Sequence, residues 1–366
     1  MKRAVLITIH LGSNFGSILQ TVASASVLRK MSCEIEVVNY IPNRCTWKHF
    51  FRNSFGKWWS FARHLFIGFP IIALNKHIYN SYLRKYVAVS NPIYTSDDFI
   101  AVCPKADIYV TGSDQVWNSI HNEGLDKHYY FDGFPEGTIK IAYSSSIGRE
   151  SLDEWEYNEV KRMLGTYKDI SVREASAKIL IESMGYKATH LLDPTFMLDR
   201  NDWKKYMGKR KINHPYVLVY LPYNIHDKGL IYQSVRKLAA VKNLNIVAFS
   251  WGIRPEKFAD KTIFFANPGD FLSLMFHADY VVTNSFHGTA FSVNLNKQFW
   301  VYMPTGFGTR IQSILDLCSL QSRLLQPDEV INNDKMVQVI DYAPVNSILG
   351  DERRKAYDFL KKALEV

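Results

Sequence analysis

Short apolar runs and stretches with helical spacing alternate through the first half of the chain. An apolar, β-favouring run at 4–9 precedes a stretch at 18–28 whose apolar residues recur at helical spacing, and a second apolar run follows at 34–39. This order predicts a strand–helix–strand unit with parallel strands. The same alternation continues, with strands predicted at 107–111, 139–146 and 170–174, a helix at 152–164 and another helix that ends at residue 180.

The alternation restarts after a polar, lysine-rich stretch at 201–214. The elements predicted beyond it are strands at 216–221, 246–250, 280–282 and 298–302 and helices at 228–242, 270–276 and 351–364. Strands that alternate with helices favour parallel α/β sheets. With 366 residues, 47% of them hydrophobic, the chain is predicted to form two α/β domains.

Charge and cysteine content narrow the functional classes. The net charge of +9 predicts anionic partners, such as phosphates, nucleic acid or an acidic membrane face. The four cysteines form no CxxC pair and have no metal-ligand spacing, so we expect a reduced, cytoplasmic protein without a bound metal. The apolar run at 4–9 is too short for a signal peptide, and no stretch is long and apolar enough to span a bilayer.

The stretch 279–290 predicts an anion site with a proton donor beside it. It reads as a buried strand, a small polar turn and the start of a helix, which Asn284 or Ser285 would cap. A helix that begins at the carboxyl end of a parallel strand points N–H groups and partial positive charge at that place. Gly288 would let a ligand approach the backbone, and His287 can exchange a proton near neutral pH.

Between Glu36 and Asp97 the sequence has no acidic residue, whereas basic and aromatic residues interleave. We interpret 43–95 as a helical insertion in the first domain. Its composition fits an anionic membrane interface and also suits nucleic acid. The third interpretation is that the insertion packs its aromatic side chains onto the first domain. The tryptophans are Trp47, Trp58 and Trp59, and the basic residues of its first part are Arg44, Lys48, Arg52, Lys57 and Arg63.

Two polar turns follow predicted strands of the first domain. The turn at 112–118 brings the carboxylate of Asp114 close to the amides of Gln115 and Asn118 and the indole of Trp117, a set that suits a sugar. Its alternative is a loop that is hydrogen-bonded to itself. Arg173, at the end of the next strand but one, is placed for an anion, or else for an ion pair with Glu174 or a nearby carboxylate.

Four motifs, read in order, carry a family resemblance. They are Gly-Ser-Asn-Phe-Gly-Ser-Ile-Leu-Gln at 12–20, Thr-Gly-Ser-Asp-Gln-Val-Trp-Asn at 111–118, Ile-Ser-Val-Arg-Glu at 170–174 and Thr-Asn-Ser-Phe-His-Gly at 283–288. The chain resembles the polysaccharide pyruvyl transferase family over nearly its whole length. The resemblance implies two Rossmann-like domains that face each other across a cleft, as in GT-B enzymes. The predicted domains are 1–200, on the acceptor side, and 213–345, on the donor side, with a helix at 350–366 that crosses back to the first domain.

The resemblance also implies an activity. Members move the enolpyruvyl unit of phosphoenolpyruvate onto a sugar, commonly as a pyruvate ketal, and the reaction needs no cofactor or metal. The acceptor would be a surface polysaccharide or its polyprenyl-diphosphate-linked precursor at the inner face of the plasma membrane. The predicted catalytic residues are His287 as acid and Asp114 as base. The predicted donor-binding residues are Arg173, Asn284, Ser285, His287, Gly288, Thr289 and Arg310. The predicted acceptor-binding residues are Asn14, Gly16, Gln20, Asp114, Gln115, Trp117 and Asn118.

The sequence departs from the family at one place. Many members have Ser-Asp-Arg-Leu-His-Gly at 283–288, and Ser285 stands where they have Arg. Arg310 or Arg254 is expected to supply that charge. Two other activities stay open on sequence alone: a GT-B glycosyltransferase that uses a nucleotide sugar, and a catalytically silent protein of a polysaccharide-assembly complex.

Overall fold

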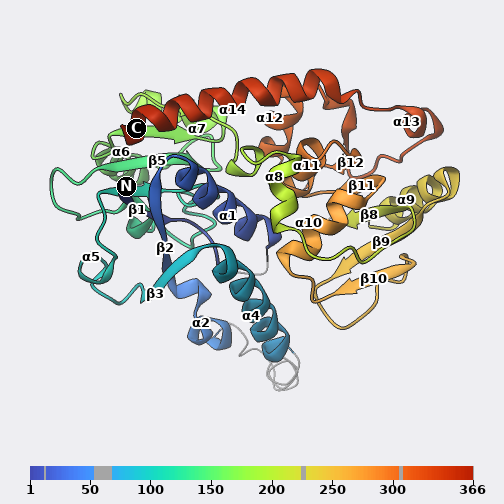
Figure 1. Cartoon of the computed structure of the whole chain (residues 1–366), viewed down its shortest axis with the longest axis horizontal. Helices are drawn as coiled ribbons and strands as arrows, with labels where there is room; N and C mark the ends of the chain where they lie inside the picture. The colour runs from blue at the N-terminus through green and yellow to red at the C-terminus, as the bar shows by residue number, and fades with distance from the viewer. Residues whose placement is uncertain (12–13, 53–67, 224–227, 305–307, 366) are drawn as a thin grey trace. The chain divides into compact units, whose positions relative to one another are not determined.

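The computed structural model describes residues 1–11, 14–52, 68–223, 228–304 and 308–365 (Figure 1). The chain divides into two compact units. Unit 1 comprises Met1–Met197 and Glu352–Val366, and unit 2 comprises Leu198–Asp351. Each unit is described by itself.

Unit 1 is built on a seven-stranded parallel sheet with the order β3-β2-β1-β4-β5-β6-β7. The strands are β1 (Lys2–Ile7), β2 (Cys33–Ile41), β3 (Ala88–Tyr94), β4 (Ile108–Thr111), β5 (Lys140–Ser145), β6 (Asp169–Val172) and β7 (Thr189–His190). The α-helices are α1 (Phe15–Lys30), α2 (Trp47–Arg52), α4 (Phe69–Tyr86), α5 (Phe99–Val102), α6 (Glu154–Leu164) and α7 (Ala175–Ser183). Short 3-10 turns are η1 (Asn43–Cys45), η3 (Lys127–Tyr130) and η4 (Pro194–Phe196).

The middle of this sheet is buried on both faces. The four residues Ala4 to Ile7 of β1 are wholly buried, as expected for a central parallel strand whose two faces are both covered. α1, which contacts β2 and α4, is buried on almost all sides, and its residues Gln20 and Thr21 are hydrogen-bonded inside the unit. The sheet therefore presents its carboxyl ends as the place where polar loops gather.

Unit 2 has a six-stranded parallel sheet with the order β10-β9-β8-β11-β12-β13. The strands are β8 (Tyr216–Tyr220), β9 (Asn245–Ser250), β10 (Lys261–Phe264), β11 (Tyr280–Thr283), β12 (Gln298–Tyr302) and β13 (Leu324–Leu325). The α-helices are α8 (Arg200–Trp203), α9 (Lys228–Lys242), α10 (Pro268–His277), α11 (Phe286–Asn294), α12 (Thr309–Leu317), α13 (Asn333–Val337) and α14 (Tyr342–Leu364), and the 3-10 turns are η5 (Lys204–Tyr206) and η6 (Gln321–Arg323). The predicted fold class, two Rossmann-like α/β domains, is confirmed.

The last helix contributes to both units. Figure 1 shows α14 in red as one long helix, and its residues from Glu352 onward group with unit 1. There Leu360 and Leu364 are buried, and Lys2 Nζ donates to the carbonyl oxygen of Leu364 at 2.6 Å. Arg353 Nε donates to the carbonyl oxygen of Phe196 at 2.7 Å. The C-terminal segment therefore packs into the hydrophobic core of unit 1.

The insertion at 43–95 is only partly helical. Its described residues form α2 and α4, but its end, Ala88–Tyr94, is the edge strand β3 and pairs with β2. Residues 53–67, which include Trp58 and Trp59, lie outside the described part of the chain. No helix in the part of the chain that the structure describes is long and apolar enough to cross a membrane.

Candidate functional site

A buried ion cluster joins three chain segments at the carboxyl edge of the unit 1 sheet. Arg173, just after β6, donates through Nη1 to Asp193 Oδ2 at 2.8 Å and through Nη2 to Asp114 Oδ1 at 3.3 Å. Its Nε donates to Glu174 Oε1 at 3.4 Å, and its side chain is only 1% exposed. Because Asp114 follows β4 and Asp193 follows β7, these ion pairs tie together the loops after three strands.

The surroundings of Arg173 determine what it can bind. Burial alone would lower the pKa of Arg173, but the three carboxylates raise it above its ordinary value, so the guanidinium stays charged. Three carboxyl groups around one guanidinium make a further anion at this point unfavourable. The structure bears out the ion-pair interpretation, whereas a phosphate contact by Arg173 stays a prediction.

The turn after β4 is hydrogen-bonded within unit 1. Asp114 has a left-handed backbone with φ of 69°, and its carboxylate accepts from Ser17 Oγ at 2.7 Å and from the backbone N–H of Gln115 at 2.9 Å. Asn118 Nδ2 donates to Gln115 Oε1 at 2.7 Å. These bonds match the alternative of a loop bonded to itself, and they leave the sugar-binding role of the turn as a prediction.

Trp117 lies inside the core of unit 1. Its ring stacks on Tyr130, with centroids 5.2 Å apart and planes 10° from parallel, and the residue is 1% exposed. Its indole N–H donates to the carbonyl oxygen of Tyr129 at 3.4 Å. A sugar could contact this ring only if the stack opened.

The first turn of the chain is tied to β1. Asn14 caps α1 by accepting from the backbone N–H of Gly16 at 2.9 Å. Gln20 is wholly buried, and its Nε2 donates to Thr8 Oγ1 at 2.9 Å. Residues 12 and 13 of this motif lie outside the described residues. The three predicted acceptor residues therefore hold the start of α1 in place.

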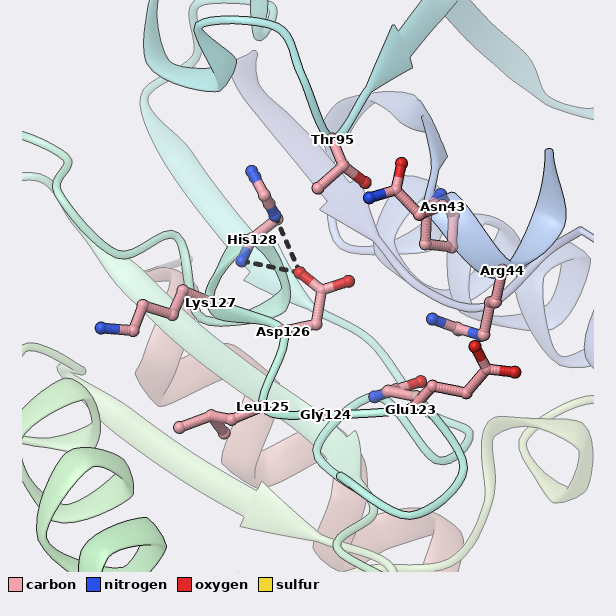
Figure 2. Close-up of a pocket in the computed structure, with 11 residues that line it drawn as sticks. Asn43, Arg44, Thr95, Glu123, Gly124, Leu125, Asp126, Lys127 and His128 are labelled. Carbon is pink, nitrogen blue, oxygen red and sulfur yellow. Dashed lines mark hydrogen bonds and ion pairs between the residues drawn. The ribbon is translucent and has the colours of Figure 1, made fainter. Parts of the chain in front are cut away.

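Two adjoining pockets open at the same edge of unit 1, and none of the predicted donor-binding, acceptor-binding or catalytic residues lines them. The larger has a volume of about 350 Å³ and is lined by 42–44, Thr95 and 122–128, as Figure 2 shows. The smaller has a volume of about 270 Å³ and includes His10 and Tyr40. The residues that line both pockets are Pro42, Arg44 and Glu123.

Asp126 is the hydrogen-bonding centre of the larger pocket. Its Oδ2 accepts from the hydroxyl of Tyr40 at 2.8 Å. Its Oδ1 accepts from Nδ1 of His128 at 2.8 Å, as Figure 2 shows. Burial, followed by the charge of Asp126, raises the pKa of Tyr40, so this hydroxyl keeps its proton and donates. The one signal in the sequence was the Asp-x-His spacing at 126–128, which puts a carboxylate beside an imidazole.

In unit 2 the strand–turn–helix at 280–289 forms as predicted. Ser285 caps α11, since its side chain accepts from the backbone N–H of Gly288 at 3.3 Å. Asn284 instead holds the loop after β8: its Nδ2 donates to the carbonyl oxygen of Tyr223 at 2.9 Å. Thr289 Oγ1 donates to the carbonyl oxygen of Ser285 at 2.9 Å.

His287 and Arg310 meet at one aromatic ring. His287 lies in the first turn of α11 and packs edge-on against Phe286, with ring centroids 5.1 Å apart. The guanidinium carbon of Arg310, near the start of α12, lies 5.4 Å from the centroid of the same ring. Both residues are nearly buried, with exposed fractions of 3% and 6%. The structure therefore brings the predicted acid and a predicted donor cation to the same place in unit 2.

Gly288 has a packing role. A Cβ atom at this position would lie 2.2 Å from Thr283 Oγ1 and 2.9 Å from Thr283 Cβ. Thr283 Oγ1 is itself fixed, because it donates to the carbonyl oxygen of Tyr220 at 2.7 Å and accepts from the N–H of Ser285 at 3.1 Å. The glycine thus lets α11 start directly against the end of β11.

Within the described ranges, no three His, Cys, Asp or Glu side chains gather in a way that could hold a metal ion.

Comparisons with known proteins place this geometry in context. The family model described as polysaccharide pyruvyl transferase matches residues 14–304. No curated protein matches the chain. A crystal structure of a UDP-N-acetylglucosamine 2-epimerase superposes with a TM-score of 0.53 and 9% identity, covering 98% of this chain and 90% of that chain. The UDP-GlcNAc 2-epimerase from Neisseria meningitidis bound to UDP-GlcNAc gives a TM-score of 0.50 and 9% identity, covering 99% and 100%. At this identity the structures show a shared fold alone.

Replacing Arg173 tests its structural role. We expect Arg173→Ala to lower the free energy of unfolding by about 3–5 kcal/mol, because three buried carboxyl groups would lose their common cation. Urea unfolding followed by circular dichroism measures this loss. The matched control is Arg162→Ala, which breaks a surface ion pair with Asp132 and should cost about 0–1 kcal/mol. A variant of wild-type stability that no longer binds phosphoenolpyruvate would instead make Arg173 a donor ligand.

Replacing Gly288 tests its packing role. Gly288→Ala should destabilise the protein by about 1–3 kcal/mol, because the added methyl group overlaps Thr283. The control is Gly252→Ala, also in unit 2, where a Cβ atom would meet nothing within 4 Å. Thermal unfolding measures the stability of both variants. Equal melting temperatures of the two would contradict the packing role of Gly288.

Proposed function

The chain belongs to the polysaccharide pyruvyl transferase family, and from this premise we propose that it moves the enolpyruvyl unit of phosphoenolpyruvate onto a sugar. The sugar belongs to a surface polysaccharide or to its lipid-linked precursor, and the product is a pyruvate ketal. The observation that carries the proposal is the meeting of His287 and Arg310 around Phe286 at the start of α11.

The donor half of the proposal rests on charge. Phosphoenolpyruvate carries a phosphate and a carboxylate, so it needs a helix N-terminus and a cation. α11 offers its N-terminus at Phe286, and Arg310 lies against that residue. Because Arg310 is nearly buried, its charge acts in a medium less polar than water and therefore more strongly. This position compensates for the serine at 285 in place of the family's arginine.

The chemical steps assign His287 the role of acid. A proton goes to the methylene carbon of phosphoenolpyruvate, a sugar hydroxyl attacks the neighbouring carbon, phosphate leaves and a second hydroxyl closes the ketal. His287 is the titrating side chain of the donor turn and supplies the proton. Asp114, the predicted base, already accepts from Ser17 and Arg173, so it would have to release one of them to act on a hydroxyl.

The acceptor half of the proposal includes the membrane. A polyprenyl-linked sugar would be met at the anionic inner face of the plasma membrane, where basic side chains are attracted. Lys48 in α2 is exposed, and the apolar Leu74 of α4 is 43% exposed. Trp47 makes contacts within the insertion. Its ring packs on Phe69, with ring centroids 4.6 Å apart, and Lys76 Nζ lies 4.2 Å from the centroid of its ring.

Phosphate release tests the transfer reaction. The wild-type protein should release inorganic phosphate from phosphoenolpyruvate when a lipid-linked or synthetic sugar acceptor is present. His287→Asn should lower turnover by ~10²–10⁴-fold, with a much smaller change in donor affinity, because it keeps a polar side chain but loses the proton. His214→Asn, at an exposed histidine of unit 2, is the matched control.

Other outcomes of this assay would indicate a different role for His287 or a different activity for the protein. Equal loss of donor affinity and rate in His287→Asn would make His287 a binding residue. Release of nucleotide from a nucleotide sugar, without turnover of phosphoenolpyruvate, would favour the glycosyltransferase. Absence of turnover with any donor, while a sugar still binds, would favour the silent assembly protein.

Vesicle binding tests the membrane contact. The protein should bind anionic vesicles at low salt, since each basic residue near the surface contributes about 1 kcal/mol of electrostatic attraction. Binding should weaken as the salt concentration rises, because salt screens this attraction. Replacing Lys48, Arg52, Lys57 and Arg63 with Gln should largely abolish binding while activity on a short soluble acceptor remains.

The control for this experiment removes the same charge elsewhere. It replaces four exposed lysines with Gln: Lys161, Lys205, Lys237 and Lys261. If both quadruple variants lose vesicles equally, net charge rather than the insertion is responsible. If the wild-type protein ignores anionic vesicles at low salt, the insertion packs on its own domain instead.

A further inference from the structure

We propose that the larger of these two adjoining pockets of unit 1, the one around Asp126 and His128, binds a sugar ring of the acceptor. This inference rests on the proposed function, because a pyruvyl transferase must hold its acceptor sugar, and it assigns that sugar to residues that no sequence motif named. The smaller pocket continues the site and takes a second, linked ring.

The pocket lies where a parallel sheet offers a ligand site. Its walls come from 42–44 after β2, Thr95 after β3 and 122–128 in the loop after β4. These segments all follow the carboxyl ends of strands on one edge of the sheet. At about 350 Å³ the pocket falls in the range of small-molecule sites, roughly 300–1,000 Å³.

The charges of the lining favour a neutral polyhydroxy ligand. The lining carries Glu123 and Asp126 beside Arg44, whereas the ammonium of Lys127 pairs with Glu159 outside the pocket at 2.9 Å, so the two carboxylates disfavour a free phosphate. A sugar hydroxyl donates and accepts at once, and it can use both kinds of group. The lining also offers the amide of Asn43 and the hydroxyl of Thr95.

The polar groups are held in place before a ligand arrives. Asp126 accepts from Tyr40 and His128, and the hydroxyls of Tyr40 and Thr95 lie 3.1 Å apart. Because Nδ1 of His128 faces the carboxylate, Nε2 is the nitrogen left at the far side of the ring. The ring itself is backed by Tyr40 and Phe99, with centroids 4.8 and 4.9 Å from its own. Fixed partners of this kind reduce the entropy lost on binding.

The loop that carries these groups is also fixed. Asn122 Nδ2 donates to the carbonyl oxygen of Val116 at 2.9 Å, which anchors the loop to the turn after β4. Glu123 Oε2 lies 3.1 Å from Nε2 of His49 in α2. The second contact links the pocket to the basic aromatic insertion, so a sugar held here lies next to the segment proposed to meet the membrane.

The size of the joined pockets argues for more than one ring. The second pocket, of about 270 Å³, shares Pro42, Arg44 and Glu123 with the first and reaches His10 in the loop after β1. A chain of two linked sugars can occupy both volumes, whereas a small ion would fill neither. The site is therefore predicted to prefer a disaccharide to its component sugars.

Saturation-transfer NMR on the whole chain tests the pocket without relying on catalysis. The probes are methyl glycosides of common hexoses and N-acetylhexosamines, and inorganic phosphate serves as the competing anion. At least one glycoside should receive saturation from the wild-type protein, and phosphate should not displace it. Asp126→Asn should weaken that binding by about tenfold or more, the loss expected for a charged hydrogen-bond partner.

Two further variants separate the pocket from the fold. Asn43→Trp changes an exposed residue and fills the pocket without touching the Asp126 bonds, so it should also abolish binding. Asp153→Asn, at an exposed carboxylate outside the pocket, should bind as the wild type does. Wild-type affinity in both Asp126→Asn and Asn43→Trp would overturn the proposal. Failure of every glycoside to bind, or their displacement by phosphate, would overturn it too.

Kinetics distinguish this inference from the proposed function. Where transfer from phosphoenolpyruvate occurs, Asn43→Trp should raise the KM of the acceptor about tenfold and leave the KM of phosphoenolpyruvate unchanged. An unchanged acceptor KM would place the acceptor elsewhere. If no transfer occurs but glycosides bind and the two variants lose them, the proposed reaction fails while the sugar site stands.

Discussion

The carboxyl edge of unit 1 is organised by one cation, Arg173, and by the three carboxylates that surround it. Its guanidinium reaches Asp193, Asp114 and Glu174, which follow three different strands of the sheet. An ion cluster of this kind contributes little net stability compared with apolar packing, but losing its one cation is costly. The cluster therefore determines where the loops lie rather than how stable the sheet is. The turn that holds Trp117 and anchors Asn122 depends on that placement.

In unit 2 the start of α11 is positioned by packing and hydrogen bonds rather than by ion pairs. The start of α11 is positioned by a glycine that admits Thr283, and by Ser285, whose side chain caps the helix. The first turn of the helix contains Phe286 and His287. The ring of Phe286 contacts both the imidazole of His287 and the guanidinium of Arg310. Ser285, at the family's arginine position, thus caps the helix, and the proposed function assigns the donor cation to Arg310 of α12. The two units divide the proposed chemistry, with donor groups on unit 2 and sugar-binding groups on unit 1.

The hydrophobic pattern was enough to predict the fold, because central parallel strands are apolar on both faces. β1 and β11 lie where the apolar runs lie. The edge strand β3 was missed, since Pro92 and a polar, half-exposed sequence carry no strand signal. The sequence was enough to locate the turn motifs, but it did not predict which side chains pack against them. Sequence could not show that Trp117 would stack on Tyr130, because those residues meet only in the folded unit.

The pocket residues were missed for the same reason. Tyr40 lies near the end of β2, Thr95 follows β3 and Asp126 lies in the loop after β4, and neither their spacing nor their composition marks them as neighbours. Only the sheet order, which sets β3, β2, β1 and β4 side by side, brings these three residues together at the carboxyl ends of the strands. Local pairs such as Asp126 and His128 can be read from a sequence, whereas a site assembled across strands needs the topology.

The central claim is that this chain adds a pyruvyl unit to a surface glycan. Mass spectrometry of the surface glycan, compared between cells with and without the intact gene, tests it most directly. The account predicts that the glycan carries the added mass of a pyruvate ketal only when the gene is intact. Glycans of identical mass from the two kinds of cell would contradict it.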